Sequence, residues 1–268
     1  MRPGNVVRCL SLLGFLLPLG AMAEEAPSVE EIVRKANAAA FYAGTDGRAE
    51  VRMTIADSQG RERRRQFTVL RKDVAEGGDQ KYLVLFSKPA DVRKTVFLVH
   101  KQVGKDDNRW LYLPGLDLVK RVSAGDNRTS FVGSDYFYED ISGRWIDEDV
   151  HELKETTDEC FTLSSTPKDP GLVEFSRYEI CIDKGDFVPR RIEYFDEQGK
   201  VYRRVEALEV KELGGFPTVT RAQVSNIRSG GHTLAEFRRV EYDLGIPDSV
   251  FTERSLRNPP PRWFSTRK

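Results

Sequence analysis

The chain has 268 residues, and its 42 Lys and Arg residues balance its 42 Asp and Glu residues. A dedicated nucleic-acid-binding protein would carry a basic stripe or a high isoelectric point, so the charge balance argues against nucleic acid as a partner. A length of this order fits one all-β domain, and charged residues, 31% of the chain and well mixed along it, suit a solvated sheet.

Residues 1–23 have the pattern of a cleaved secretory signal peptide. Arg2 and Arg8 provide the positive start, Cys9–Gly20 is a short apolar run, and Ala21-Met22-Ala23 is a small-x-small cleavage site. The apolar run is too short to span a bilayer, which needs about 20 residues. The alternative is a buried N-terminal helix.

Lipidation at Cys9 is rejected because the apolar run follows this cysteine instead of preceding it. We expect cleavage after Ala23, which leaves a single domain over residues 24–268 in the periplasm of a Gram-negative-type bacterium.

A helix is predicted directly after the cleavage site. Ser28 and Glu31 form a capping box of the S-x-x-E type, and Gly44 is a typical helix end. Between them, apolar residues recur at helical spacing and form one stripe that must be buried. The stripe consists of Val29, Ile32, Val33, Ala36 and Ala40.

Beyond this helix the apolar pattern has a period of two, which predicts strands joined by short turns. The expected strands are Arg48–Asp57, Glu62–Lys72, Gln80–Ser87, Thr95–Gln102, Arg109–Leu113, Val119–Ser123, Val150–Glu155, Glu159–Thr166, Val173–Asp183, Val188–Asp196, Lys200–Glu212, Thr218–Arg228 and Thr233–Tyr242. Strands and helices do not alternate, which argues against an α/β fold. The pattern predicts a meandering antiparallel sheet or barrel.

Two of these strands are apolar on both faces. Lys81–Phe86 and Val96–Val99 lack the alternation that a sheet with one wet face requires. A helix, a second sheet or a ligand must therefore cover the second face. The alternative is the core of an ordinary β-sandwich.

Three motifs in order along the chain resemble a known family. They are Trp110-Leu111-Tyr112-Leu113-Pro114, Gly133-Ser134-Asp135-Tyr136-Phe137-Tyr138-Glu139-Asp140 and Phe251-Thr252-Glu253-Arg254-Ser255-Leu256. Together they are similar to the LolA-like family of periplasmic lipid and lipoprotein carriers, in particular its longer "outer-membrane lipoprotein-sorting" subfamily. The mature chain is longer than the lipoprotein carriers proper, so their cargo does not carry over directly.

The resemblance implies an open, unclosed antiparallel β-barrel, here of about 11–13 strands, with a few short helices over its concave face and an apolar cavity for acyl chains. It implies no cofactor and no catalytic residues. Its partners would be a lipid or acylated lipoprotein as cargo, an inner-membrane exporter as donor and an outer-membrane acceptor. The alternative is a lipid-sensing envelope module that binds a membrane-anchored regulatory protein.

Large apolar and aromatic residues of the strands and motifs are the candidates for the cavity wall. We expect Trp110 and Tyr112 to face the cavity and Leu111 and Leu113 to face away, because side chains alternate and aromatic rings with a polar tip suit a cavity mouth. The candidates are Phe86, Phe97, Trp110, Tyr112, Phe131, Tyr136, Phe137, Tyr138 and Ile141.

The segment from Phe131 to Gly143 holds four aromatic residues between two glycines. Ser134 or Asp135 is the expected N-cap of one helical turn, which would place Phe137 and Ile141 on a shared face. With its glycines as hinges, the segment is either a movable lid or a fixed plug.

The family's carriers use an arginine to hold the helical lid, and Arg71 is the nearest candidate here. The alternative for Arg71 is an exposed charge at the end of a strand.

Cys160 and Cys181 are the two cysteines of the mature chain. They lie symmetrically about the Pro170-Gly171 turn, so a simple hairpin would set them opposite each other, close enough for a disulfide. The oxidising periplasm favours that bond. The alternative is two buried thiols.

No constellation for metal binding or catalysis is recognised. His100, His151 and His232 are isolated and have no metal-ligand spacing. Asp135, Glu139 and Asp140 could suggest paired glycosidase carboxylates, but an N-cap followed by two solvated acids explains them better. The basic run 61–65 either touches anionic head groups or protects a solvated strand edge.

Overall fold

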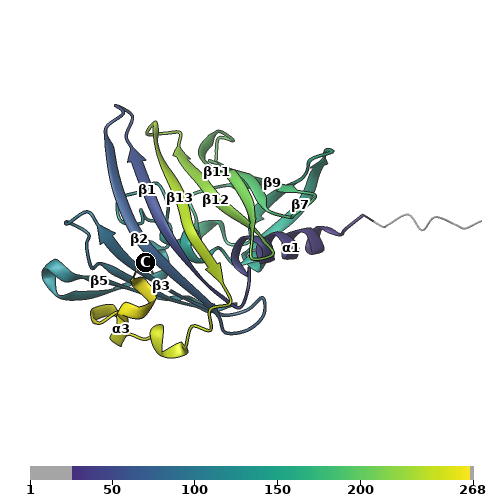
Figure 1. Ribbon diagram of the computed structural model, residues 1–268. Coiled ribbons are helices and arrows are strands. Elements are labelled where there is room, and N and C mark those ends of the chain that lie inside the picture. The colour runs from purple at the N-terminus through teal and green to yellow at the C-terminus, as the bar shows by residue number, and fades with distance from the viewer. Residues whose placement is uncertain (1–25, 266–268) are drawn as a thin grey trace, which may run out of the picture.

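The computed structural model describes residues 26–265, which form one strongly curved antiparallel sheet with short helices on both faces (Figure 1). The predicted signal peptide lies outside the described residues. The strands are β1 (Asp46–Ala56), β2 (Glu62–Asp73), β3 (Gln80–Lys88), β4 (Val96–Lys101), β5 (Asn108–Leu113), β6 (Leu118–Val122), β7 (Asp149–Thr156), β8 (Cys160–Pro167), β9 (Arg177–Asp183), β10 (Pro189–Phe195), β11 (Val201–Leu213), β12 (Phe216–Asn226) and β13 (Gly231–Tyr242). The α-helices are α1 (Val29–Phe41), α2 (Tyr138–Ser142), α3 (Arg254–Arg257) and α4 (Pro261–Phe264).

The 13 strands follow the order β6-β5-β4-β3-β2-β1-β13-β12-β11-β10-β9-β8-β7. The sheet is therefore a meander that the chain leaves at one edge, β6, and re-enters at the other, β7. These two edges do not pair with each other, so the barrel is open. The predicted fold is confirmed.

The connection between the two edge strands decides how the open side is filled. Residues 123–148, called here the crossing segment, leave edge strand β6 and must reach edge strand β7 on the opposite side of the sheet. The short helix α2 lies within this segment. Part of the chain therefore packs inside the curve of the sheet without forming a strand.

Helix α1 forms where the sequence predicts it. The Ser28 hydroxyl accepts a hydrogen bond from the backbone N–H of Glu31 at 3.2 Å, which satisfies one of the free donors of the first turn. The stripe residues Ile32, Val33 and Ala36 are buried against strands β8 and β9. Their contacts there are Phe161, Leu163 and Ile182.

The concave face of β2–β5 carries an aromatic cluster centred on Phe131 of the crossing segment. Its ring lies 5.6 Å from that of Phe86, 5.5 Å from that of Phe97 and 5.5 Å from that of Tyr138. Phe131 is 1% exposed. We call this group the concave cluster. Aromatic pairs at these separations contribute beyond their buried area, so the crossing segment is firmly attached here.

The convex face of the same strands is covered by the C-terminal segment, residues 244–264. Its Ile246, Val250, Phe251 and Leu256 pack on Leu83 and its neighbours in β2–β4, and all five are at most 2% exposed. We call this group the convex cluster. In Figure 1 the segment, drawn in yellow with α3, lies in front of β3 and β5. Both apolar faces expected for β3 and β4 are thus covered, one by the crossing segment and one by the C-terminal segment.

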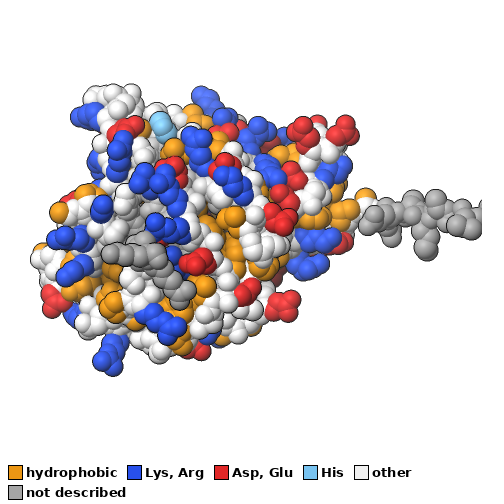
Figure 2. All heavy atoms as spheres, viewed as in Figure 1, with side chains coloured by type: hydrophobic (Ala, Val, Ile, Leu, Met, Phe, Trp, Pro, Cys, Tyr) orange, Lys and Arg blue, Asp and Glu red, His pale blue; other side chains and the backbone are white. Residues whose placement is uncertain are grey.

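Beside the convex cluster, the outer face of β1 and β13 is polar. Arg48 pairs with Glu50 at 2.7 Å and with Glu241 at 3.3 Å, and Arg239 pairs with Glu50 at 3.0 Å. Figure 2 shows charged side chains of both signs over this side of the molecule. Within residues 26–265, no helix is long and apolar enough to span a bilayer.

The disulfide between Cys160 and Cys181 is present, with the two Cα atoms 5.7 Å apart. The expected direct pairing is wrong, because Cys160 lies opposite Asp183 and Cys181 lies opposite Thr162. The connection between β8 and β9 is wide, because β9 begins only at Arg177. It shifts the register by two residues, and the bond runs diagonally across the pair.

Candidate functional site

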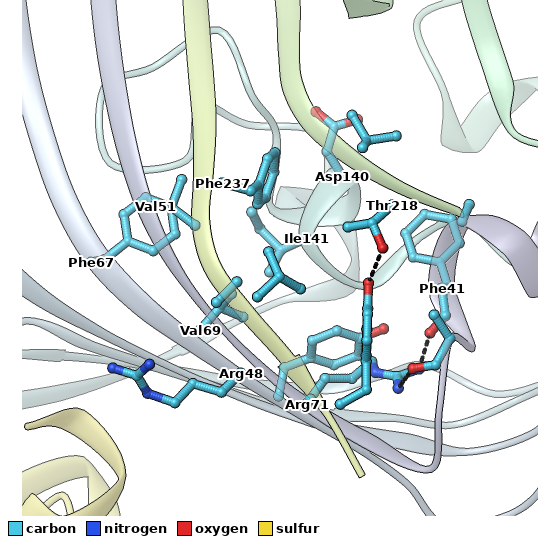
Figure 3. A pocket seen from close by; sticks show the side chains of 18 of the residues that line it. Phe41, Arg48, Val51, Phe67, Val69, Arg71, Asp140, Ile141, Thr218 and Phe237 are labelled. Atoms are coloured by element: carbon cyan, nitrogen blue, oxygen red, sulfur yellow. Dashed lines mark hydrogen bonds between the residues drawn. The ribbon is translucent and has the colours of Figure 1, made fainter. Parts of the chain in front are cut away.

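A cavity lies between the concave face of the sheet, α1 and the crossing segment, beside the concave cluster. It has two compartments. Compartment one has a volume of about 260 Å³ and lies over β1, β2 and β13 (Figure 3). Its wall is mostly apolar and includes Val51, Met53, Phe67, Val69, Ile141 and Phe237.

Compartment two has a volume of about 270 Å³ and lies over β8–β12. Its wall is again mostly apolar and includes Val33, Ala36, Leu163, Ile180, Ile192 and Val205. Each compartment is slightly smaller than a typical small-molecule pocket, and the two together fall within the usual range of about 300–1,000 Å³.

The two compartments meet at residues that line both, a group which we call the divider. It is built from the end of α1, the crossing segment and β12. The shared residues are Ala40, Phe41, Tyr136, Asp140 and Val219. Tyr136 and Asp140 are its polar members. The hydroxyl of Tyr136 is buried and has no hydrogen-bond partner among the described residues, and burial raises the pKa of this phenol.

Arg71 fastens the end of α1 to the sheet. Its guanidinium donates hydrogen bonds to the carbonyl oxygens of Phe41, Ala43 and Gly44, the last at 2.8 Å (Figure 3). It also pairs with Asp73 at 3.2 Å, and its side chain is 11% exposed. These carbonyls at the end of a helix have no partners within the helix, so a cation is well placed there. Arg71 is not an exposed strand-end charge.

Two further groups meet at the same end of α1. Gln80 Nε2 donates to the Phe41 carbonyl at 2.8 Å. The Lys101 ammonium donates to the Ser142 carbonyl at 2.7 Å and lies 5.4 Å from the centre of the Phe41 ring. Lys101 is 3% exposed, and burial lowers the pKa of its ammonium to about 8. The end of α1, β2–β4 and α2 are thus joined around Phe41.

A network of charges joins parts of the crossing segment to one another, to β11 and to the chain before β9. Arg128 pairs with Glu139 and, at 2.7 Å, with Glu174, while Arg203 pairs with Asp140. The predicted N-cap at Ser134 or Asp135 with two solvated acids is wrong. The helical turn begins three residues later, at Tyr138, and Glu139 is 7% exposed. Glu139 is buried because Arg128 and Arg144 of the same segment pair with it, and Asp140 is half-buried beside Arg203 of β11.

The other candidates, from this segment and from β3 and β4, divide into two groups. Tyr136 and Ile141 line the cavity, whereas Phe86, Phe97, Phe131 and Tyr138 belong to the concave cluster beside it. Phe137 does not share the apolar face of Ile141. It precedes α2 in extended conformation, and its ring lies between the guanidinium groups of Arg128 at 5.0 Å and Arg203 at 4.4 Å.

Trp110 and Tyr112 share one face of β5, as expected, but they face away from the cavity. Both pack against the convex cluster, while Leu111 and Leu113 pack on the concave side. The choice of face was wrong. The aromatic rings suit the convex side because its cover leaves Tyr112 partly exposed, and its hydroxyl there donates to Asp117 at 3.2 Å.

Several wall residues were not singled out from the sequence. Met53 and Phe237 alternate with polar neighbours in β1 and β13, so the period of two identifies them as inward-facing. Val69 stands next to the apolar Leu70 in β2 and has no such signal. The alternation in the sequence does not show that the crossing segment leaves the concave face of β1, β2 and β13 uncovered. Among the described residues, no group of His, Cys, Asp and Glu has the arrangement of a metal site.

The sequence profile of a family described as "Uncharacterized protein" matches residues 78–258. Solved structures show the same architecture. A DUF1329 family protein from Desulfovibrio piger aligns with a TM-score of 0.77 and 28% identity over 85% of this chain and 98% of its own. The chain belongs to the profile's family, and its fold is LolA-like.

Two further structures support the LolA-like fold. An outer membrane lipoprotein-sorting protein domain from Vibrio parahaemolyticus aligns with a TM-score of 0.76 and 24% identity, over 86% of this chain and 100% of its own. A LolA superfamily protein from Nitrosomonas europaea aligns with a TM-score of 0.67 and 17% identity, over 85% and 99%. No curated protein matches the chain.

Proposed function

We propose that this protein binds the acyl chains of lipids or lipoproteins in its concave cavity and carries them through the periplasm. The observation that supports this most is the pair of apolar compartments under α1, in a fold shared with a lipoprotein-sorting domain. Every CH₂ group that enters such a cavity from water contributes about 0.8 kcal/mol. Binding needs no chemical step, so the protein acts as a carrier and not as an enzyme.

The donor and acceptor of the cargo would be membrane proteins, an exporter in the inner membrane and a receptor in the outer membrane. A passive cavity releases its cargo only when a partner opens it or offers a better site, because the buried chain would otherwise return to water at the same cost per CH₂ group. The predicted signal peptide supports the periplasm as the compartment.

The Arg71 contacts are the proposed latch of the cavity. Ala39, Ala40 and Phe41 at the end of α1 form part of the wall of compartment one, and Arg71 holds the carbonyls that follow them. Cargo that enters here must displace this end of the helix. Breaking the latch should therefore change the rate of exchange more than the identity of the cargo.

Native mass spectrometry of the protein purified from its own periplasm tests the carrier proposal directly. We expect lipid or acylated peptide to be retained in stoichiometric amount and to be lost under denaturing conditions. Protein that is free of lipid, and that also fails to bind added octanoyl lipids, would contradict the proposal.

The latch is tested by Arg71→Met, with Arg64→Met as the matched control. Arg71 makes charged hydrogen bonds worth about 1.5–3 kcal/mol, whereas the side chain of Arg64 is 72% exposed. Arg71→Met should accelerate uptake of a fluorescent fatty acid at least about tenfold in stopped-flow measurements, and Arg64→Met should leave the rate unchanged. Equal rates in both variants would remove Arg71 from the mechanism.

A further inference from the structure

Three turns of the β1–β6 half of the sheet lie together at one end of the molecule. Consecutive strands are antiparallel, so every second turn falls at the same end. A salt bridge of 3.4 Å between Arg65 and Asp91 joins the first turn to the second. Val96, after the second turn, lies opposite Tyr112, before the third. We call the three segments the basic edge, and they are residues 57–65, 88–94 and 114–121.

The basic edge carries an excess of positive charge. Its segments contain nine Lys and Arg residues against four Asp and Glu residues. Each of the four acids is paired with an arginine, in the pairs Asp57–Arg61, Glu62–Arg64, Asp91–Arg65 and Asp117–Arg257. Four further cations are exposed and take part in no salt bridge within residues 26–265, so their charges are free to meet an anionic surface. They are Lys88, Arg93, Lys94 and Lys120.

Other turns of the sheet lack this excess. At the same end, the segments that follow β8, β10 and β12 contain three Lys and Arg residues against four Asp and Glu residues; these are residues 168–176, 196–200 and 226–231. At the opposite end of β1–β6, segments 73–80 and 101–108 contain two against five. The positive charge is therefore local, and it would orient the molecule on a negative surface.

The hairpin of β5 and β6 adds exposed apolar side chains to the basic edge. Leu116 and Leu118 are 73% and 46% exposed, and the hairpin lies at the left of the view in Figure 1. Asp117 between them pairs with Arg257 of α3 at 3.0 Å. The Arg257 guanidinium also lies 5.4 Å from the centre of the Tyr112 ring. The two leucines are thus presented on a tip that α3 fastens to the sheet.

We propose that the basic edge is a docking surface for a bilayer that contains anionic phospholipid, with the tip at Leu116 and Leu118 entering the interface. Lys and Arg side chains near such a surface are attracted to its negative potential, and apolar side chains that leave water there strengthen the contact. The basic edge contributes no residue to the wall of either compartment. The inference therefore goes beyond the proposed carrier function and does not depend on it.

Co-sedimentation with lipid vesicles tests the role of charge. The mature protein should pellet with mixed vesicles of phosphatidylcholine and phosphatidylglycerol and not with phosphatidylcholine alone. It should be released at about 1 M salt, where the Debye length falls to about 3 Å. Lipid that enters the cavity stays with the protein in the supernatant, so the pelleted protein reports docking on the surface.

A pair of double variants tests whether the charge acts locally. Lys88→Gln with Lys120→Gln should weaken partition into mixed vesicles about twentyfold, because each basic residue at an anionic surface contributes about a factor of five. The matched control, Lys105→Gln with Lys168→Gln, removes the same charge from exposed positions outside the basic edge. It should keep the wild-type partition.

Two turns of identical sequence test the tip. Leu116 and Leu172 each end a Pro-Gly-Leu 3-10 turn, and they are 73% and 76% exposed. Leu116→Ser should weaken partition into mixed vesicles about tenfold, because each CH₂ group kept in water costs about a factor of four. Leu172→Ser should leave the partition unchanged. Both variants should keep the wild-type melting temperature, since neither side chain is packed in the core.

The outcomes separate this inference from the carrier function. If the protein does not pellet with mixed vesicles, or if both double variants lose partition equally, the docking surface is overturned and the carrier function stands. Equal losses for Leu116→Ser and Leu172→Ser would remove the tip from the contact and overturn the proposed orientation. Docking that follows the expected pattern in a protein that takes up no octanoyl lipid would support this inference and contradict the carrier function.

Discussion

The two faces of β3 and β4 are both apolar in sequence but are closed in different ways. On the convex face the C-terminal segment covers the sheet, and its four large side chains are at most 2% exposed. On the concave face the crossing segment covers only the part around Phe131, and the adjoining surface of β1, β2 and β13 borders the cavity. One face is therefore core, and the other is partly core and partly binding surface.

The difference follows from the kind of chain that covers each face. The C-terminal segment follows the sheet closely with apolar residues. The crossing segment must reach from β6 to β7, and ion pairs hold it on the way, Asp140 with Arg203 of β11 and Arg128 with Glu174 of the chain before β9. Buried charges need specific partners, so the segment lies beside these groups and leaves apolar surface uncovered on both sides.

The largest expected effect comes from opening the convex face. Phe251→Ala removes a fully buried ring, for which about 3–5 kcal/mol of the free energy of unfolding is the usual loss. Urea denaturation measures this loss. Affinity for octanoyl lipid per folded molecule should stay at the wild-type value, because Phe251 lies on the opposite side of the sheet from the cavity. A loss below about 1 kcal/mol would show that the convex cover is not part of the core.

A smaller effect on the free energy of unfolding is expected from a change of pH. It arises from Lys101, on the concave side of the sheet. Burial lowers the pKa of Lys101 to about 8, against about 10.4 in the unfolded chain. Below pH 8 the folded state carries the full cost of the buried charge, and this cost declines as pH rises from 8 toward 10.4. The free energy of unfolding should therefore increase by about 1–2 kcal/mol between pH 7.5 and 9.5.

The control for this pH effect is Lys101→Met, which should lack the increase, while Phe251→Ala should retain it. Denaturation at several pH values measures the slope in each variant. Parallel pH profiles for the wild type and Lys101→Met would assign the pH dependence to another group.

Most of the fold follows from patterns that are local in the sequence. The period of two predicts each strand, and the capping box predicts α1. Hairpin pairing of consecutive strands gives the two halves of the sheet, β1–β6 and β7–β13, whereas the pairing of β1 with β13 joins distant parts of the chain. The register of β8 and β9 did not follow, because the connection between them is wide and irregular, and the symmetry argument for Cys160 and Cys181 assumed a tight turn.

The site was less predictable because it depends on contacts between distant parts of the chain. Alternation shows that Trp110 and Leu111 point to opposite faces, but the position of the C-terminal segment decides which face is inside. Glu139 reads as a solvated acid in its own sequence and is buried only because Arg128 lies beside it. Arg71 was singled out through the family resemblance; the residue pattern alone also fits an exposed charge.

The smallest expected effect on stability belongs to Phe237, which tests whether the concave surface is a wall or a core. Phe237 is half-buried and lines compartment one (Figure 3). Phe237→Ala removes a ring that borders empty volume on one side and has fewer packing contacts to lose. We expect unfolding to become easier by about 1 kcal/mol, well below the loss for Phe251→Ala.

The same change should enlarge compartment one. In a series of saturated acyl glycerols of increasing length, the variant should prefer longer chains than the wild type, since the volume vacated by the ring accepts further CH₂ groups and each contributes about 0.8 kcal/mol. Calorimetric titration of the series measures the preferred length. Phe67 lines compartment one and also packs against the concave cluster, so the same titration of Phe67→Ala serves as the comparison. If Phe237→Ala destabilises the protein as strongly as Phe251→Ala and leaves the preferred length unchanged, the concave surface at this point is core, and the difference between the two faces does not hold.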